Sequence, residues 1–202
     1  MYFCTRLHSN KPKKDIKLTI MNYIETGIDG VWVIEPKVLG DSRGYFMEAF
    51  KEAELIEKIG PVHFIQDNES QSGYGVLRGL HYQKGAFSQA KLVRVIKGRV
   101  IDVAVDLRRS SPTFGQHVSV ELSEANKRQL FIPRGFAHGF CVLSDEALFL
   151  YKVDQPYAPL SEACIRFDDP TLDIDWPLAP QEMILSEKDK EGVRFTDADL
   201  FE

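Results

Sequence analysis

Short runs of β-branched and aromatic residues dominate this chain from Met21 onward, and Gly, Pro, Ser and Asp separate them. In His117–Leu122 the valines and the leucine alternate with polar residues, so one face of this strand is apolar. Lys97-Gly98 lies between two apolar runs and predicts a hairpin turn. Strands are expected at Gly30–Ile34, Tyr45–Phe50, Lys91–Ile96, Arg99–Leu107, His117–Leu122, Gln129–Ile132, Gly139–Leu143 and Leu148–Val153.

Helical spacing occurs only at Glu52–Ile59, where Leu55, Ile56 and Ile59 share one side and Gly60 ends the helix. One short helix cannot supply the crossovers of a parallel sheet, so a βαβ architecture is excluded. Many short antiparallel strands with few short helices predict an all-β jelly roll or barrel. Such barrels bind ligands in their mouth or interior, where polar side chains among apolar ones indicate a site.

Length and composition predict one globular domain. The chain has 202 residues, with 44% hydrophobic and 27% charged residues. A net charge of −5 gives no basic field for nucleic acid, and no segment reaches the roughly 18 apolar residues that span a bilayer. Three cysteines without C-x-x-C spacing favour a reducing cytoplasm. Residues 1–20 are basic and lack an export signal, so we expect a disordered or upstream extension before a single domain at 21–202.

The densest polar cluster lies between Gln66 and Lys91. Simple alternation along its second strand-like segment puts Arg78 and His81 on opposite faces. A bulge at Gly79 would bring the two side chains into one pocket, because glycine tolerates the backbone geometry of a bulge. The sequence therefore predicts a bulge at this glycine.

His81 is the best candidate for a general base, because imidazole exchanges a proton near neutral pH. An isolated histidine in a strand is more often a buried, hydrogen-bonded core residue. Arg78 or Lys91 alone would be interpreted as a solvated residue at the edge of the sheet. The concentration of Arg78, Gln83 and Lys91 around His81 favours the catalytic interpretation.

A second histidine, His138, ends a P-x-G-x-x-H pattern that begins at Pro133 and looks like the second cupin motif. Metal-binding cupins add an H-x-H and a glutamate from the first motif. Here His81-Tyr82-Gln83 offers one histidine, so no metal is expected and His138 is assigned a structural or substrate-contacting role. Tyr151, in an apolar strand, is on pattern alone a core aromatic.

Many blocks of the sequence, in order, resemble the dTDP-4-dehydrorhamnose 3,5-epimerase family of cupin-fold sugar-nucleotide epimerases. The similarity covers Met21 to about Asp189. Its blocks include Gly40-Asp41-Ser42-Arg43-Gly44-Tyr45-Phe46, Gln66-Asp67-Asn68, Leu77-Arg78-Gly79-Leu80-His81, Lys91-Leu92-Val93-Arg94, Ser111-Pro112-Thr113-Phe114-Gly115, Asn126-Lys127-Arg128-Gln129-Leu130, Pro133 through Phe140, and Tyr151-Lys152.

The resemblance implies a cofactor-free epimerisation of dTDP-4-dehydro-6-deoxy-D-glucose at C3 and C5, giving dTDP-4-dehydro-L-rhamnose. Both carbons are α to the C4 ketone, so proton removal leaves an enolate, and reprotonation of the opposite face inverts the centre. By similarity His81 is the base, Tyr151 the acid and Lys91 the oxyanion stabiliser. Asp189 is the best match for the carboxylate that orients the base.

The resemblance also implies the substrate-binding positions and the partners. Family members are homodimers in which an N-terminal strand of one subunit completes the other's site. Arg43 and Glu48 are therefore expected to act across the interface. The substrate-binding positions are Arg43, Glu48, Gln66, Asn68, Arg78, His138, Glu162 and Lys188. Two alternatives remain open: a metal-dependent cupin oxygenase and an inactive sugar-nucleotide-binding module.

Overall fold

Strands make up most of the regular structure in the computed structural model, which describes residues 21–202. The expected extension at 1–20 lies outside the described residues. Two α-helices are present, α1 (Glu52–Ile59) and α2 (Glu187–Lys190). The strands are β1 (Met21–Glu25), β2 (Trp32–Pro36), β3 (Leu39–Asp41), β4 (Gly44–Phe46), β5 (Gln66–Gly73), β6 (Leu77–Gln83), β7 (Lys91–Lys97), β8 (Arg99–Asp106), β9 (His117–Ser123), β10 (Gln129–Ile132), β11 (Phe136–Val142), β12 (Glu146–Val153) and β13 (Glu162–Cys164).

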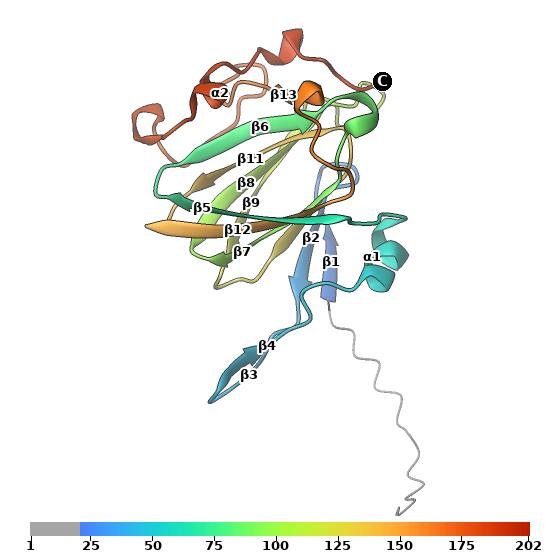
Figure 1. Cartoon of the computed structure of the whole chain (residues 1–202), viewed down its shortest axis with the longest axis vertical. Coiled ribbons are helices and arrows are strands. Elements are labelled where there is room, and N and C mark those ends of the chain that lie inside the picture. Colours follow the sequence, from blue (N-terminus) through green and yellow to red (C-terminus); the bar gives the residue numbers. More distant parts are fainter. Residues whose placement is uncertain (1–20) are drawn as a thin grey trace, which may run out of the picture.

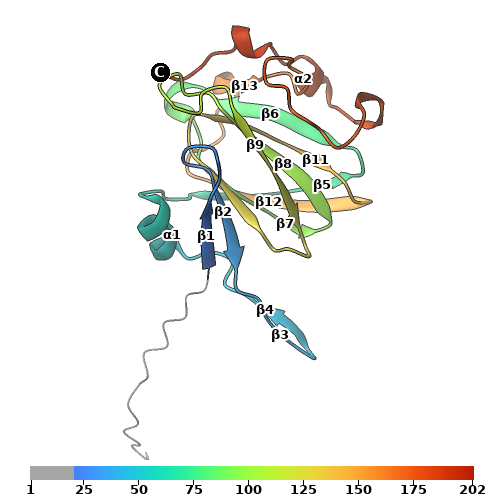
Figure 2. The same ribbon diagram turned by 180° about the vertical axis from the view of Figure 1, so that it is seen from behind.

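Two antiparallel sheets face each other, as Figures 1 and 2 show from opposite sides. The six-stranded sheet has the order β1-β2-β10-β7-β12-β5, and the five-stranded sheet has the order β13-β6-β11-β8-β9. The short hairpin β3-β4 forms a separate ribbon that projects from the body (Figure 1). The predicted all-β, antiparallel fold is confirmed, and α1 has the predicted bounds.

The prediction of a hairpin at Lys97-Gly98 is wrong. A turn does occur there, and Gly98 has the positive φ of +81° that favours glycine. However, β7 pairs with β10 and β12, whereas β8 pairs with β11 and β9. The turn therefore passes the chain from one sheet to the other, because neighbouring runs in sequence need not share a sheet.

Some strands begin or end at residues other than the predicted ones, and some were not predicted. The strand expected at Tyr45–Phe50 ends at Phe46, because its pairing partner β3 has only three residues. Strand β11 starts at Phe136, three residues before the expected Gly139, and pairs there with β8. Strands β1, β3 and β13 were not among the predicted runs because they are short or carry polar residues on an exposed face.

The main core fills the space between the two sheets. Alternation sends every second side chain of each strand inward, and burial of these apolar side chains supplies most of the stabilisation. From the six-stranded sheet come Val93, Val95, Leu130, Ile132 and Phe149, and from the five-stranded sheet Val100, Ala104, Val120, Leu122, Phe136, Phe140 and Val142.

The outer face of each sheet is also covered. Helix α1 packs Leu55 against Ile34, Leu92 and Phe131 of the six-stranded sheet. The C-terminal segment carries Phe195 onto the outer face of the five-stranded sheet, and α2 lies against β6. None of the helices in residues 21–202 has the length and apolarity needed to cross a membrane.

Candidate active site

A β-bulge at Gly79 reshapes the strand that carries His81. Opposite β6 on β11, His138 faces His81 and Phe140 faces Arg78, so β6 has one extra residue between the two pairs. Gly79 has φ +137°, and a Cβ atom there would lie 2.5 Å from the Cα of Gly139. The predicted bulge is confirmed, and its close backbone approach explains the glycine.

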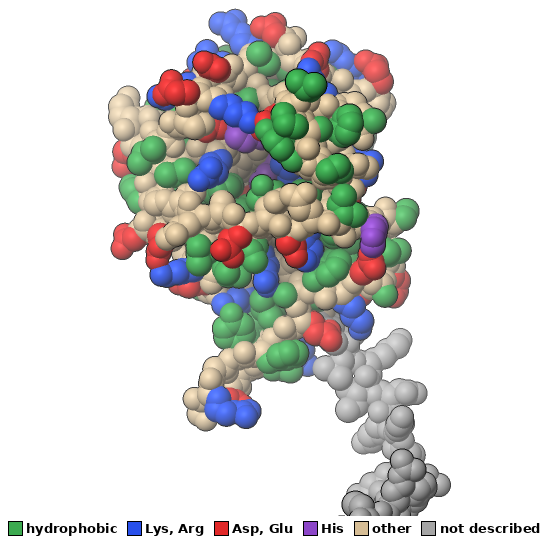
Figure 3. Space-filling view, viewed as in Figure 1, with side chains coloured by type: hydrophobic (Ala, Val, Ile, Leu, Met, Phe, Trp, Pro, Cys, Tyr) green, Lys and Arg blue, Asp and Glu red, His purple; other side chains and the backbone are tan. Residues whose placement is uncertain are grey.

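The bulge brings Arg78 and His81 into one cavity, as predicted. The cavity has a volume of about 170 Å³ and lies between the two sheets. His81 enters it from β6 of the five-stranded sheet and Tyr151 from β12 of the six-stranded sheet. Figure 3 shows histidine side chains inside a hollow of this face, beside lysine or arginine side chains. The cavity is lined by Ser70, Arg78, His81, Lys91, His138, Phe140, Phe149 and Tyr151.

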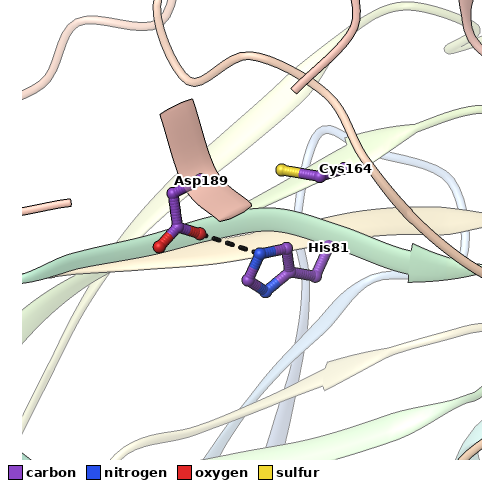
Figure 4. A group of neighbouring side chains, drawn as sticks. All are labelled: His81, Cys164 and Asp189. Carbon is purple, nitrogen blue, oxygen red and sulfur yellow. Dashed lines mark ion pairs between the residues drawn. The ribbon is translucent and has the colours of Figure 1, made fainter. Parts of the chain in front are cut away.

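His81 forms an ion-pair contact with Asp189, the carboxylate predicted as its partner. Its Nε2 lies 2.8 Å from Asp189 Oδ1, and the other ring nitrogen points away from Asp189 (Figure 4). Ser186 caps α2, and its hydroxyl donates to Asp189 Oδ2 at 2.5 Å, while the Gly79 amide donates to Oδ1 at 3.0 Å. These contacts hold the carboxylate, which is only 3% exposed, against His81.

The surroundings of Asp189 favour its ionised form. Burial by itself raises the pKa of this carboxyl, but the close contact with His81 and the hydrogen bonds from Ser186 and the Gly79 amide outweigh it and lower the pKa well below its usual range. Asp189 therefore carries a negative charge at neutral pH. It can orient the imidazole of His81 and stabilise the imidazolium that proton abstraction would create.

A second histidine–carboxylate pair lies deeper in the cavity wall. His138 Nε2 lies 2.9 Å from Asp102 Oδ2, and both side chains are buried. Burial raises the pKa of Asp102 and lowers the pKa of His138, because neither charged form is solvated there. His138 is thus a neutral hydrogen-bonding group at pH 7.

Lys91 lines the same cavity, and its ammonium group is electrostatically coupled to Asp102. Burial lowers the pKa of Lys91 to about 8, although the charges of Asp102 and Glu162 act in the opposite direction. The ammonium group is charged at neutral pH. A charged donor held inside a cavity is well suited to stabilise an oxyanion.

Tyr151 lies between β5 and β7, where Asn68 and Val93 are its pairing partners. Its ring packs near Phe149, with ring centroids 6.2 Å apart. Burial raises the pKa of its phenol, while Arg78 lowers it. The hydroxyl therefore keeps its proton at neutral pH, so Tyr151 can act as a proton donor.

Glu162 and Lys188 lie together in a second cavity, which Cys164 also lines. Lys188 Nζ forms an ion pair with Glu162, and the Tyr157 hydroxyl donates to Glu162 Oε2 at 2.6 Å. Arg78, in the cavity itself, donates to the Ser72 hydroxyl at 3.1 Å. Of these three predicted binding residues, Arg78 lines the cavity around His81, whereas Glu162 and Lys188 line a separate one.

The remaining predicted binding residues do not line the cavity around His81. Gln66 donates to Asn68 at 2.7 Å on strand β5, which forms an edge of the six-stranded sheet. Arg43 lies at the tip of the β3-β4 hairpin, where its side chain is 88% exposed and contacts Asp41. Glu48 follows that hairpin, and one of its carboxylate oxygens is buried without a hydrogen-bond partner among the described residues.

Sequence reasoning misplaced one residue and missed two. Gln83 does not serve His81, because its side-chain amide donates to the backbone oxygens of Phe87 and Pro156 and so fixes two loops. Asp102 was not assigned to the site, although a carboxylate in the middle of an apolar run was an available signal. Ser186 was missed because only the folded helix start brings it to Asp189.

Fold and cavity together define a class: a cupin-like jelly roll with a cavity of histidine, lysine, arginine and tyrosine side chains between its two sheets. Comparison with known proteins makes the assignment specific. Residues 25–197 match the sequence model of the family described as dTDP-4-dehydrorhamnose 3,5-epimerase. The chain is 55% identical to the dTDP-4-dehydrorhamnose 3,5-epimerase of Shigella flexneri over 182 residues, which cover 90% of this chain and 99% of that protein.

Comparison with solved structures identifies the same family. The crystal structure of dTDP-4-dehydrorhamnose 3,5-epimerase from Elizabethkingia anophelis is 52% identical with a TM-score of 0.85, covering 88% of this chain and 97% of its own. The crystal structure of dTDP-6-deoxy-D-glucose-3,5-epimerase from Legionella pneumophila, in complex with dTDP-4-keto-L-rhamnose, is 53% identical with a TM-score of 0.85. The match covers 89% of this chain and 95% of that one. The chain belongs to the dTDP-4-dehydrorhamnose 3,5-epimerase family, a family of isomerases.

Proposed function

We propose that the protein epimerises dTDP-4-dehydro-6-deoxy-D-glucose at C3 and C5 without a cofactor, giving dTDP-4-dehydro-L-rhamnose. The observation that carries this proposal is the cavity between the sheets, which His81 and Tyr151 enter from opposite sides. An inversion through an enolate needs a proton acceptor on one face of the sugar and a donor on the other. The cytoplasm remains the predicted compartment.

His81 is the proposed base. Because Nε2 lies 2.8 Å from the Asp189 carboxylate, we assign the ring proton to Nε2, which leaves the lone pair of Nδ1 for the substrate. Nδ1 would remove the proton from C3 or C5. The ionised carboxylate of Asp189 would then stabilise the imidazolium, so each abstraction proceeds without an isolated buried charge.

Tyr151 and Lys91 complete the proposed chemistry. The enolate oxygen at C4 gains negative charge as the proton leaves, and the Lys91 ammonium group would stabilise that charge. The Tyr151 phenol would return a proton from the other side of the ring and invert the centre. His138, held by Asp102, would then contact the substrate as a neutral group.

Arg78 and Lys188 are the cationic groups best placed to bind the diphosphate, with Glu162 holding Lys188 in place. Gln66 and Asn68 are proposed to contact the nucleotide by similarity to the family.

We also propose that the protein is a homodimer in which Arg43 and Glu48 serve the partner's cavity. The projecting β3-β4 hairpin supports this, because its apolar residues Tyr45 and Phe46 are 57% and 65% exposed.

Hydrogen exchange tests the reaction directly. Incubation with dTDP-4-dehydro-6-deoxy-D-glucose in deuterated water should place deuterium at C3 and C5, as read by NMR. Absence of exchange at both carbons would exclude the proposed function, and exchange at one carbon would identify a single-centre epimerase. Tyr151→Phe should still permit deprotonation but impair inversion; normal inversion in that variant would remove the acid assignment.

Mixing inactive variants tests the shared site. His81→Ala and Arg43→Ala chains should each be weakly active alone. Randomly mixed dimers should recover about a quarter of the wild-type rate, because half of them are mixed and each mixed dimer has one intact site of two. No recovery after subunit exchange, with dimers verified by light scattering, would place Arg43 outside the partner's site.

A further inference from the structure

The proposed mechanism leaves one nucleophilic side chain at the base unused, the thiol of Cys164. Strand β13 pairs with β6 so that Cys164 lies directly opposite His81. Directly opposed residues of an antiparallel pair carry their side chains on the same face. The sulfur of Cys164 lies beside the His81–Asp189 contact (Figure 4), and the ligand atoms of the three residues all lie within 4.8 Å of one another.

We propose that His81, Cys164 and Asp189 form a binding site for a zinc-class divalent cation, and that its occupation reversibly switches off the base. The three residues offer imidazole nitrogen, thiolate sulfur and carboxylate oxygen, a donor set that suits Zn²⁺ or Cd²⁺ and not Mg²⁺. Among residues 21–202 this is the one group of three or more such side chains with compatible spacing.

The spacing needs little adjustment to accept the cation. Zinc–ligand bonds of about 2.0–2.3 Å place tetrahedral ligand atoms roughly 3.5 Å apart. His81 Nε2 and Asp189 Oδ1, now 2.8 Å apart, would separate by less than about 1 Å, and the thiol would close in from within 4.8 Å. Water would take the fourth position, as in zinc sites with three protein ligands.

Charge and protons balance at this site. Asp189 is already a carboxylate, and His81 binds through the lone pair of Nε2 after its proton moves to Nδ1. Burial raises the pKa of the Cys164 thiol, so the thiol is protonated before binding and loses one proton to solvent when the metal binds. The two negative ligands then neutralise the two positive charges of the cation.

Binding would inhibit for a structural reason, which rests on the proposed role of His81. A neutral imidazole carries one N–H, and a metal on Nε2 confines that proton to Nδ1. Nδ1 then has no lone pair with which to accept a proton from the sugar. The same metal binds the carboxylate of Asp189, so the carboxylate no longer stabilises a positive charge on His81.

The cation can also reach the site without passing the side chains of Tyr151 and Lys91. Cys164 lines a second, open cavity of about 420 Å³. Glu162, Lys188 and Glu191 line this cavity too, and it is separate from the cavity that holds Tyr151 and Lys91. A small cation can therefore reach the sulfur from this side.

Metal binding by the substrate-free protein tests the site independently of activity. Cd²⁺ should produce the ultraviolet charge-transfer band of a cadmium–thiolate bond with one equivalent per chain, and Zn²⁺ should abolish the band by competition. Cys164→Ser should lose the band and bind Zn²⁺ about 100-fold more weakly. Cys141→Ala, which removes a buried thiol elsewhere in the described chain, should keep both properties. An unchanged band in Cys164→Ser would overturn the proposal.

Inhibition is the second measurement. Zn²⁺ should slow C3 and C5 exchange in the wild type, a chelator should restore the rate, and Mg²⁺ should have no effect. Cys164→Ser should keep the wild-type rate without metal and need about 100-fold more Zn²⁺ for inhibition. Equal sensitivity of the two proteins would overturn the inhibitory role. If the wild type has no exchange activity, the proposed function fails, while the cadmium band still decides whether the metal site exists.

Discussion

The cavity contains two histidine–carboxylate pairs built from the same side chains but placed in different surroundings. His81 is 28% exposed, and its partner Asp189 accepts further hydrogen bonds from Ser186 and the Gly79 amide. His138 and Asp102 lie directly behind, with 8% and 0% of their side chains exposed. Asp102 has His138 as its hydrogen-bond donor among the described residues.

This difference determines the charge that each pair can hold. Extra donors lower the pKa of Asp189 despite its burial, whereas burial raises the pKa of Asp102. The first pair can therefore accept a proton and stabilise the resulting imidazolium, while the second is suited to neutral hydrogen bonding. In the proposed mechanism, the number of donors around the carboxylate, more than the histidine itself, distinguishes the base from the binding group.

The strongest test of this difference is to substitute each histidine in turn. We expect His81→Asn to reduce deuterium exchange at C3 and C5 by roughly 10²- to 10⁴-fold, because it removes the proton acceptor. His138→Asn should cost only about fivefold, which corresponds to one hydrogen bond of about 1 kcal/mol. Single-turnover exchange measured by NMR compares the two. Losses of equal size would show that both histidines take part in proton transfer.

The carboxylates give the next largest contrast. Asp189→Asn should lower exchange by about 100-fold or more, because an amide cannot stabilise the imidazolium of His81. Asp102→Asn should leave exchange within about tenfold but lower the free energy of unfolding by ~1–3 kcal/mol, because it disturbs a fully buried polar pair. Denaturant unfolding and exchange rates, measured on both variants, separate the two effects. An Asp102→Asn enzyme as slow as Asp189→Asn would assign catalysis to the deeper pair as well.

Much of this arrangement could be predicted from sequence, because it depends on local patterns. Alternation in β9 and the apolar spacing of α1 predicted their structures, and Gly79 predicted the bulge that joins Arg78 to His81. These features depend on a few neighbouring residues. The contact of Asp189 with His81 spans the chain and was expected only through resemblance to a family.

Other features depend on tertiary neighbours, so the local pattern could not predict them. The turn at Lys97-Gly98 is formed by local chemistry, but pairing with distant strands decides that it joins two sheets. Likewise, the sequence shows Asp102 only as a polar residue between apolar ones. The register of β8 with β11 is what places its carboxylate next to His138.

The bulge itself can be tested by filling the space that glycine leaves. Gly79→Ala would place a Cβ 2.5 Å from the Cα of Gly139 and would require an L-residue at φ +137°. We expect the free energy of unfolding to fall by ~1–3 kcal/mol and exchange to fall by about 10- to 100-fold, because His81 shifts relative to the substrate. Gly27→Ala, at a position with no atom within 4 Å of the added Cβ, is the matched control. Wild-type exchange in Gly79→Ala would mean that the bulge does not position the base.

Lys91 lines the cavity together with both histidines and gives the smallest expected effect, a dependence of the rate on pH. Its pKa of about 8 means that the ammonium charge is lost as pH rises through 8, so exchange should fall roughly tenfold between pH 7 and pH 9. The raised pKa of Tyr151 keeps its phenol protonated over this range. Unfolding does not account for the loss, because the unfolded lysine holds its proton up to about 10.5, so the Lys91 contribution to stability increases with pH between 8 and 10.5.

The matched variant for this prediction is Lys91→Arg, whose guanidinium keeps its charge at every pH used. We expect its rate to be lower than that of the wild type at pH 7 but nearly constant up to pH 9, whereas Lys91→Met should be slow throughout. Initial exchange rates at constant ionic strength, with circular dichroism at each pH to verify folding, provide the measurement. If the wild-type rate stays level from pH 7 to pH 9, the charge on Lys91 does not stabilise the enolate, and that role passes to neutral donors such as His138.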